Sequence, residues 1–382
     1  MKKILLVVAL FTLPVTLSGQ SRAKNVILFL ADAGGTSTIA AASLHGHGAP
    51  QKLFIQRMPH IGLSDTSSAG HIVTDSAAGM TAIVTGYKTQ NGVISQSASA
   101  VRGKQDGAPL KTILEYAEER GLSTGVISND SLTGATPAAT YAHVNDRGKT
   151  AEIFMQAFTP RFGDGVDVMI GGVRPNIVKA LAEAGTDLET LSQKYKRPIL
   201  SSIAEVPADA TRAIVLLESS AFDLEEALRT AMRILSKNRK GYFLMVEADV
   251  HTDRLRRGLD RMLEMDKVVA TAAKLASRDT LLLFTADHSF DVRLRGGRFG
   301  EALLAGLEEA EAAAKAENRR DLRIPAVRVD NGHTGEEVLV AAQGPGAERV
   351  RGYMANTDIF HVMLRAFGWK PSPAAEAADT RN

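Results

Sequence analysis

The sequence predicts an α/β protein in which a central, mostly parallel β-sheet is flanked by helices on both faces. Short apolar runs rich in β-branched residues recur along the chain, and longer segments with helical spacing of apolar residues separate them. No internal repeat and no linker-like stretch divides residues 24–369, so we expect one catalytic domain there.

The individual elements follow from the same periodicities. Strands are predicted at residues 25–30, 123–128, 241–246 and 279–285. Helices are predicted at residues 112–121 and 260–276, and the Ala/Glu-rich residues 301–320 are predicted to form a solvated amphipathic helix on an appendage.

Composition excludes several classes of protein. The 382 residues are 45% apolar and 23% charged, which is typical of a globular chain rather than a disordered, fibrous or multispanning one. Lys plus Arg number 45 against 43 for Asp plus Glu, so the net charge of +2 gives no reason to expect a nucleic-acid partner. Because there are no cysteines, any metal must be held by His, carboxylate or hydroxyl groups.

The two ends of the chain predict an export signal and a tail. Residues 1–19 combine Lys2 and Lys3, an apolar run and small residues after it, which is typical of a secretory signal peptide. The run is too short to span a membrane comfortably, and a buried N-terminal strand is the alternative. We expect a periplasmic or secreted protein without a membrane span in its mature form, and a flexible tail at residues 370–382.

Acidic residues and histidines follow three of the predicted strands. They are Asp32, then Glu247, Asp249, His251 and Asp253, then Asp287 and His288. Alone, an Asp in such a place is usually a helix cap or a turn residue. Ligand sites of α/β sheets lie at the carboxyl ends of the strands, and like charges gathered there favour divalent cations.

A serine follows Asp75 and opens a predicted helix of small residues. Ser76 would therefore lie where free N–H groups and positive potential suit an anionic ligand such as phosphate. The alternative is that Ser76 or Asp75 is simply the helix cap.

Six short segments, taken in order, resemble the motifs of the alkaline phosphatase family. They are the Asp after the first strand (Asp32), Asp-Ser-Ala-Ala (75–81), Ala-Thr-Pro-Ala-Ala (135–139), Ala-His-Val-x-x-Arg (142–147), Thr-Ala-Asp-His (285–288) and His-Thr-Gly (333–335). The resemblance covers residues 24–369 and implies the fold of that family with reduced insertions. It implies that Ser76 is the nucleophile and forms a phosphoserine, and that Arg147 holds two phosphate oxygens. The alternative, which its place in the motif disfavours, is that Arg147 is a surface charge.

The resemblance also implies two Zn²⁺ ions and one Mg²⁺ ion. One Zn²⁺ site comprises Asp32, Ser76, Asp287 and His288, and His333 belongs to the other. Asp32, Thr136 and Glu247 are similar to the family's magnesium ligands, although Thr136 could be a plain turn residue before proline. Gly134 stands where many members carry an Asp or His, which implies weaker magnesium binding.

One region departs from the family pattern. Members place an Asp five residues after the strand-end Glu and a His four residues further on, both on the water-activating metal. Here those positions are Thr252 and Arg256, neither of which is a plausible ligand. If Asp253 replaces the Asp, the His position falls on Arg257 and the pattern fails again.

An alternating pattern offers another solution. Glu247, Asp249, His251 and Asp253 would face one side of an extended chain. We therefore predict that Asp249 and His251 complete the second zinc site with His333, and that Asp253 is an outer partner or a substitute ligand.

The expected activity is hydrolysis of small-molecule phosphate monoesters through a phosphoserine intermediate, with release of inorganic phosphate. The sulfatase nucleophile motif is absent around Ser76. A phosphodiesterase of the same superfamily is one alternative. A non-catalytic exported protein that binds metal or phosphate is another, because residues 249–257 depart from the pattern. The sequence leaves homodimerisation open.

Overall fold

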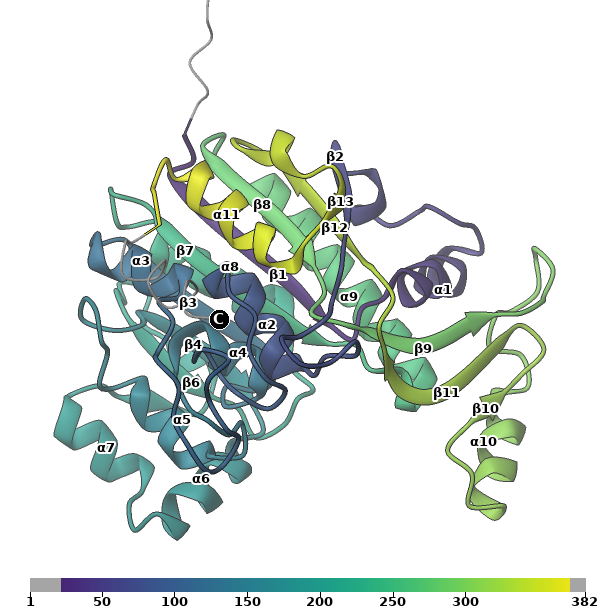
Figure 1. Cartoon of the computed structure of the whole chain (residues 1–382), viewed down its shortest axis with the longest axis horizontal. Helices are drawn as coiled ribbons and strands as arrows, with labels where there is room; N and C mark the ends of the chain where they lie inside the picture. The colour runs from purple at the N-terminus through teal and green to yellow at the C-terminus, as the bar shows by residue number, and fades with distance from the viewer. Residues whose placement is uncertain (1–21, 372–382) are drawn as a thin grey trace, which may run out of the picture.

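The computed structural model describes residues 22–371. Within that range the chain forms a ten-stranded sheet, a separate three-stranded sheet and eleven α-helices (Figure 1). The predicted signal peptide, residues 1–19, lies outside the described residues, as does nearly all of the predicted tail. No helix between residues 22 and 371 is long and apolar enough to cross a membrane.

The large sheet is mostly parallel, as predicted. In spatial order its strands are β13 (Gly352–Met354), β2 (His60–Ser64), β12 (Val338–Gln343), β8 (Thr280–Thr285), β1 (Asn25–Asp32), β7 (Tyr242–Asp249), β3 (Ser123–Ser131), β4 (Val168–Gly172), β6 (Ala213–Leu216) and β5 (Ile199–Leu200). Only β12 in this described sheet runs antiparallel to its neighbours, β2 and β8. The strand β1 lies in the middle, between β7 and β8 (Figure 1).

Helices cover both faces of this sheet. The first face carries α2 (Ser76–Thr85), α3 (Ile113–Glu119), α4 (Ala135–Tyr141), α5 (Thr150–Gln156), α6 (Arg174–Glu183), α7 (Leu188–Tyr195) and α11 (Asn356–Ala366). The second face carries α1 (Thr36–His47), α8 (Leu224–Leu235) and α9 (Leu255–Leu275). Short 3₁₀ helices are η1 (Ile55–Arg57), η2 (Ile203–Glu205), η3 (Thr252–Arg254) and η4 (Ala347–Arg349).

The alternation of β1 explains why both faces are covered. Successive side chains point to opposite faces, so Val26 and Leu28 join one core whereas Ile27 and Phe29 join the other. All eight residues of β1 are buried, which matches the continuous apolar run of a central parallel strand.

Two predicted helices have different bounds in the structure. The helix predicted at residues 260–276 begins at Leu255, because Leu255 and Leu259 extend its buried face toward the N-terminus. The helix predicted at residues 301–320 is only α10 (Leu307–Ala316). Gly306 and Asn318 have positive φ angles, and these left-handed residues lie just before its first and just after its last turn.

The appendage around α10 includes a small sheet. Its strands are β9 (Ser289–Leu294), β11 (Val327–Thr334) and β10 (Leu322–Arg323), with β11 in the middle. This arm extends away from the large sheet (Figure 1), while its inner end brings residue His333 next to Phe290 of β9.

The register of the central strands determines where the site forms. Asp32 at the end of β1 pairs with Asp249 at the end of β7, and β8 ends beside them at Thr285. The residues that follow these strands therefore meet at one edge of the sheet.

Candidate active site

Ser76 lies at the first turn of α2 and is not its cap. The Asp75 side chain caps the helix by accepting a hydrogen bond of 3.1 Å from the N–H of Ala78. The Ser76 hydroxyl is thus free to turn inward, where its Oγ donates to Asp32 Oδ1 at 3.5 Å and lies 3.2 Å from His288 Nε2.

Small residues allow α2 to approach this edge. A Cβ atom at Gly79 would lie 2.7 Å from the carbonyl oxygen of Asp287, so a larger residue would push the helix away. The glycine in the helix therefore determines how close Ser76 comes to the residues after β8.

Ser76, Asp32, Asp287 and His288 form what we call the buried group. His288 Nδ1 donates to the Ser289 carbonyl oxygen at 3.1 Å, which turns Nε2 toward Asp32 Oδ1, 3.3 Å away. Asp287 Oδ1 accepts from the N–H of His288 at 2.9 Å. Its Oδ2 atom is buried without a hydrogen-bond partner among the described residues.

Burial and charge shift the pKa values of this group strongly. Burial, with the charge of Asp32, raises the pKa of Asp287 to about 6. Burial opposes the charged form of His288, but Asp287 and Asp32 outweigh it and raise the pKa of His288 to about 9. Burial also acts against the Asp32 carboxylate, yet nearby His251 and His288 hold its pKa well below the ordinary value. Such a set of competing charges is what a divalent cation would neutralise.

A further carboxylate and a hydroxyl lie on the other side of Asp32. The hydroxyl of Thr136, in the first turn of α4, donates to Asp32 Oδ2 at 3.4 Å. Glu247 on β7 is buried, and burial, followed by the charge of Asp32, raises its pKa well above the ordinary value. Its Oε2 atom has no hydrogen-bond partner within residues 22–371. Thr136 thus lies in a helix, with its hydroxyl group directed at Asp32, and not in a turn.

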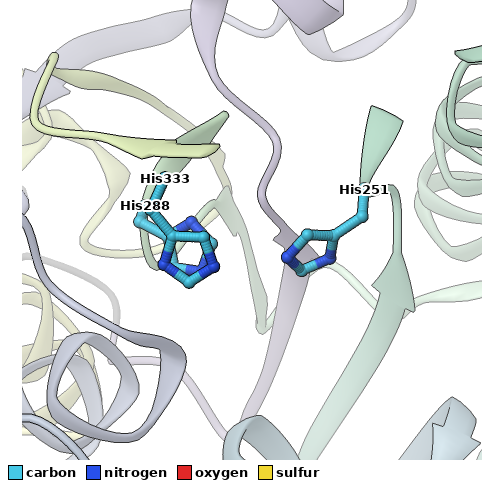
Figure 2. A group of neighbouring side chains, drawn as sticks. All are labelled: His251, His288 and His333. Carbon is cyan, nitrogen blue, oxygen red and sulfur yellow. The ribbon is translucent and has the colours of Figure 1, made fainter. Parts of the chain in front are cut away.

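Two more histidines complete the edge (Figure 2). The His333 ring stacks on His288 with centroids 3.9 Å apart, and its Nδ1 donates to the Thr74 carbonyl oxygen at 3.1 Å. His251 faces this pair from the end of β7, with its ring centroid 5.6 Å from His288 and 5.7 Å from His333. Burial, followed by the charge of His288, lowers the pKa of His333 to about 4.

The ligand atoms fall into two sets, each with its members within 4.8 Å of one another. One set is Asp32, Asp287 and His288, and the other is His251, His288 and His333. Their oxygen and nitrogen donors suit Zn²⁺ and other divalent ions without thiolates. The unpaired oxygens of Asp287 and Glu247 likewise fit an ion that the protein would bind there.

The structure places Asp249 and Asp253 outside both sets. The strand ends at Asp249, so the extended alternation does not continue, and η3 leaves Asp253 exposed. Asp249 instead forms ion pairs with Arg257 and Arg261. A ligand role for Asp249 or Asp253 therefore stays a prediction.

An open pocket of about 290 Å³ exposes the site to solvent. It is lined by Asp32, Ser76, Asp130, Arg147, Asp249, His251, Asp253, Arg257 and His333. Arg147 lies in its wall, where Nη1 forms an ion pair with Asp75 Oδ2 at 3.1 Å. Arg147 is thus placed beside Ser76 and not merely on the outer surface.

Sequence reasoning missed three charged residues of this region: Asp130, Arg257 as a pocket residue, and Arg261. Asp130 follows the predicted strand at residues 123–128, so the rule that found Asp32 could have found it. Its pKa is raised by burial and then by Asp249 and Asp32. Arg257 and Arg261 are four residues apart on α9, a spacing that predicts a shared face but not their partner.

Comparisons with known proteins agree with this geometry. The sequence model of the family described as alkaline phosphatase matches residues 23–194 and 207–321. Streptomycin-6-phosphate phosphatase of Streptomyces griseus is 29% identical, covering 92% of each chain. The tissue-nonspecific alkaline phosphatase of Mus musculus is 28% identical over 90% of this chain and 83% of its own.

A solved structure shares the fold. The alkaline phosphatase of the Antarctic bacterium TAB5 aligns with a TM-score of 0.74 at 25% identity, covering 92% of this chain and 100% of that one. A variant of that enzyme, also 25% identical with a TM-score of 0.72 and the same coverage, was solved with magnesium bound.

Proposed function

This chain belongs to the alkaline phosphatase family, an enzyme family, and on that premise we propose that it is an exported phosphatase that hydrolyses phosphate monoesters through a phosphoserine at Ser76. The observation that carries the proposal is the position of the Ser76 hydroxyl. It lies at a helix N-terminus, beside His288 Nε2 and Asp32 Oδ1, in the pocket that Arg147 lines.

The residues of the pocket support two displacements in sequence. Ser76 Oγ gives up its proton and attacks the phosphorus atom. The P–O bond to the alcohol breaks as the new bond forms, and the leaving oxygen takes up a proton to become the alcohol. Water then attacks the phosphoserine, inorganic phosphate leaves, and Ser76 Oγ regains a proton. Arg147 holds the non-bridging oxygens during both displacements, since its guanidinium offers several N–H donors in one plane.

The donor set supports two Zn²⁺ sites and one Mg²⁺ site. Asp32, Ser76, Asp287 and His288 would hold one zinc ion, and His333 with His251 the other. Asp32, Thr136 and Glu247 offer only oxygen donors, which magnesium prefers. When bound, such ions lower the pKa of a coordinated hydroxyl and offset the charge that develops on a leaving oxygen. Magnesium bound to the variant of the Antarctic enzyme supports the third site.

The test is turnover of a chromogenic aryl phosphate by purified protein. We expect hydrolysis that a chelator abolishes and that Zn²⁺ with Mg²⁺ restores. A matched bis-aryl phosphate should be hydrolysed more slowly, and the opposite preference would favour the diesterase alternative. Protein that binds zinc but hydrolyses neither ester would be the non-catalytic binding protein instead.

Export is proposed from the leader-like pattern of residues 1–19. N-terminal sequencing of protein made in a Gram-negative host should find a mature chain that begins shortly after Gly19. A full-length chain that stays in the cytoplasm would contradict export without touching the catalytic proposal.

A further inference from the structure

We infer that Asp249 is not a metal ligand but a positioning residue: it orients His251 toward the second metal, and Arg257 and Arg261 hold Asp249 for that task. This inference rests on the proposed function, because it concerns the metal that His333 would share. It concerns the region in which the chain departs from the family pattern.

Both oxygens of Asp249 already have partners. Oδ1 accepts from His251 Nδ1 at 2.8 Å and from the N–H of His251 at 3.2 Å. Oδ2 accepts from Arg257 Nη2 at 3.0 Å and from Arg261 Nη1 at 2.7 Å. A carboxylate that is shared between two guanidinium groups is a poor donor to a cation, since the arginines already neutralise its charge.

One of the two arginines, Arg261, is itself anchored. Arg261 is largely buried, with 11% of its side chain exposed, and also donates to the Asp249 carbonyl oxygen at 3.1 Å. It follows Arg257 by one turn of α9, so both reach Asp249 from the same helix face. From the other side, Asn129 Oδ1 accepts the Asp249 N–H at 2.8 Å. These contacts leave the Asp249 carboxylate little freedom to turn toward an ion.

His251 has the opposite arrangement. Its Nδ1 donates to Asp249, which leaves Nε2 as the ring nitrogen that can bind an ion once it carries no proton. Nε2 makes no hydrogen bond to any part of the chain that the structure describes. A metal-bound histidine usually donates its second ring nitrogen to a carboxylate in this way, which fixes the ring and its tautomer. The ring faces His333 and His288, and the three ligand atoms lie within 4.8 Å of one another (Figure 2).

The experiment measures Zn²⁺ binding to metal-free protein by calorimetry with a competing chelator, and bound zinc by elemental analysis. We expect His251→Ala to lose about one equivalent of tightly bound zinc. Asp249→Asn should keep the stoichiometry but weaken the second site about 10- to 100-fold, as for other groups that orient a ligand.

The zinc stoichiometry of Asp249→Asn decides between the two roles, because loss of a direct ligand would remove the ion. The double variant tests whether Asp249 has any effect beyond His251. If Asp249 acts through His251, adding Asp249→Asn to His251→Ala should change the remaining zinc affinity by less than about twofold. Asp260→Asn is a matched control, because Asp260 also pairs with a histidine, His45, at 2.8 Å, on the same helix but outside the pocket. It should bind zinc like the unchanged protein.

Two results would overturn the inference. One is loss of a full zinc equivalent in Asp249→Asn, and the other is a further large loss when that change is added to His251→Ala. If Asp249→Asn does not fold, an anomalous map of the zinc-loaded unchanged protein decides, because an ion directly on an Asp249 oxygen also overturns it. Ester turnover is measured separately, so an inactive protein with the expected zinc coupling would contradict only the proposed function.

Discussion

The two halves of the site are built in different ways. The buried group lies on the ends of β1 and β8 and the start of α2, and the side chains of Asp287 and His288 are completely buried. The half around Asp249, His251 and Arg257 comprises the end of β7, the connection after it and the start of α9. There the side chains of His251 and Arg257 are 25% and 39% exposed. One half is thus fixed by the core, and the other by contacts between side chains.

This difference explains where the chain follows its family and where it departs. The position of a strand-end residue is dictated by the register of the sheet, so Asp32 cannot move without disturbing β7 and β8. The connection after β7 and the helix start that follows it tolerate new residues more readily, provided that these residues form ion pairs or hydrogen bonds. Arg257 and Arg261, near the start of α9, both form ion pairs with Asp249.

The largest effect is expected in the buried half, from Ser76→Ala. Loss of the attacking oxygen should reduce turnover about a thousandfold or more and abolish the phosphoserine. Acid quenching with labelled substrate, followed by peptide mapping, measures this. Label on another residue, or an unlabelled but fully active variant, would remove Ser76 from its role.

The second prediction tests whether the buried half is arranged for an ion. Asp287→Asn should lose about one equivalent of zinc, yet it should stabilise the metal-free protein by about 1–3 kcal/mol, since it removes a buried charge beside Asp32. Denaturant unfolding with and without a chelator measures both effects. Reduced stability of the variant in both conditions would mean that Asp287 is a structural residue only.

The third prediction concerns the more open wall of the pocket. Arg147→Ala should lower turnover roughly ten- to hundredfold. This corresponds to a loss of about 1.5–3 kcal/mol of stabilisation, because a charge-assisted contact to phosphate is removed. Inhibition by inorganic phosphate should weaken in parallel. Unchanged phosphate affinity would show that Arg147 serves only its ion pair with Asp75.

The smallest effect should come from a buried carboxylate remote from the site. Glu118 of α3 accepts a hydrogen bond from Thr124, and burial, with Asp167 and Asp164 nearby, raises the pKa of Glu118 to about 7. The folded state therefore holds its proton more tightly than the unfolded state, for which the pKa is near 4.5. This contribution to stability is complete below about pH 4.5 and is lost as the pH rises through about 7.

Ionisation of Glu118 should lower the free energy of unfolding by an amount on the order of 1–3 kcal/mol between pH 5 and pH 8, and Glu118→Gln should remove this decrease. Unfolding free energies at pH 5 and pH 8, with and without a chelator, measure it. Because Glu118 lies outside the pocket, the chelator should not alter the difference between the variant and the unchanged protein. If the chelator did change that difference in unfolding free energy, the stability effect of Glu118 would depend on bound metal, and its independence from the site would be contradicted.

Much of the fold followed from local patterns. Apolar runs such as that of β1 indicated buried strands, and their alternation with helical segments indicated a mostly parallel sheet. The same patterns located Asp32, Asp249 and Asp287 at or just after strand ends, where the structure has them. Helix bounds followed less well, because Leu255 and Gly306 acquire their roles only from what packs around them or how the backbone turns.

The sequence by itself determined which chemistry the site can use and at which sheet edge it lies, because residue types and strand periodicity are local properties. Only the tertiary structure decided how the donors are oriented. His333 stacks on His288, and two arginines on α9 hold the Asp249 carboxylate beside His251. Those contacts join different elements of the chain, so the local periodicity of apolar residues cannot predict them. They form because burial and charge pairing select one packing among many that the sequence pattern allows.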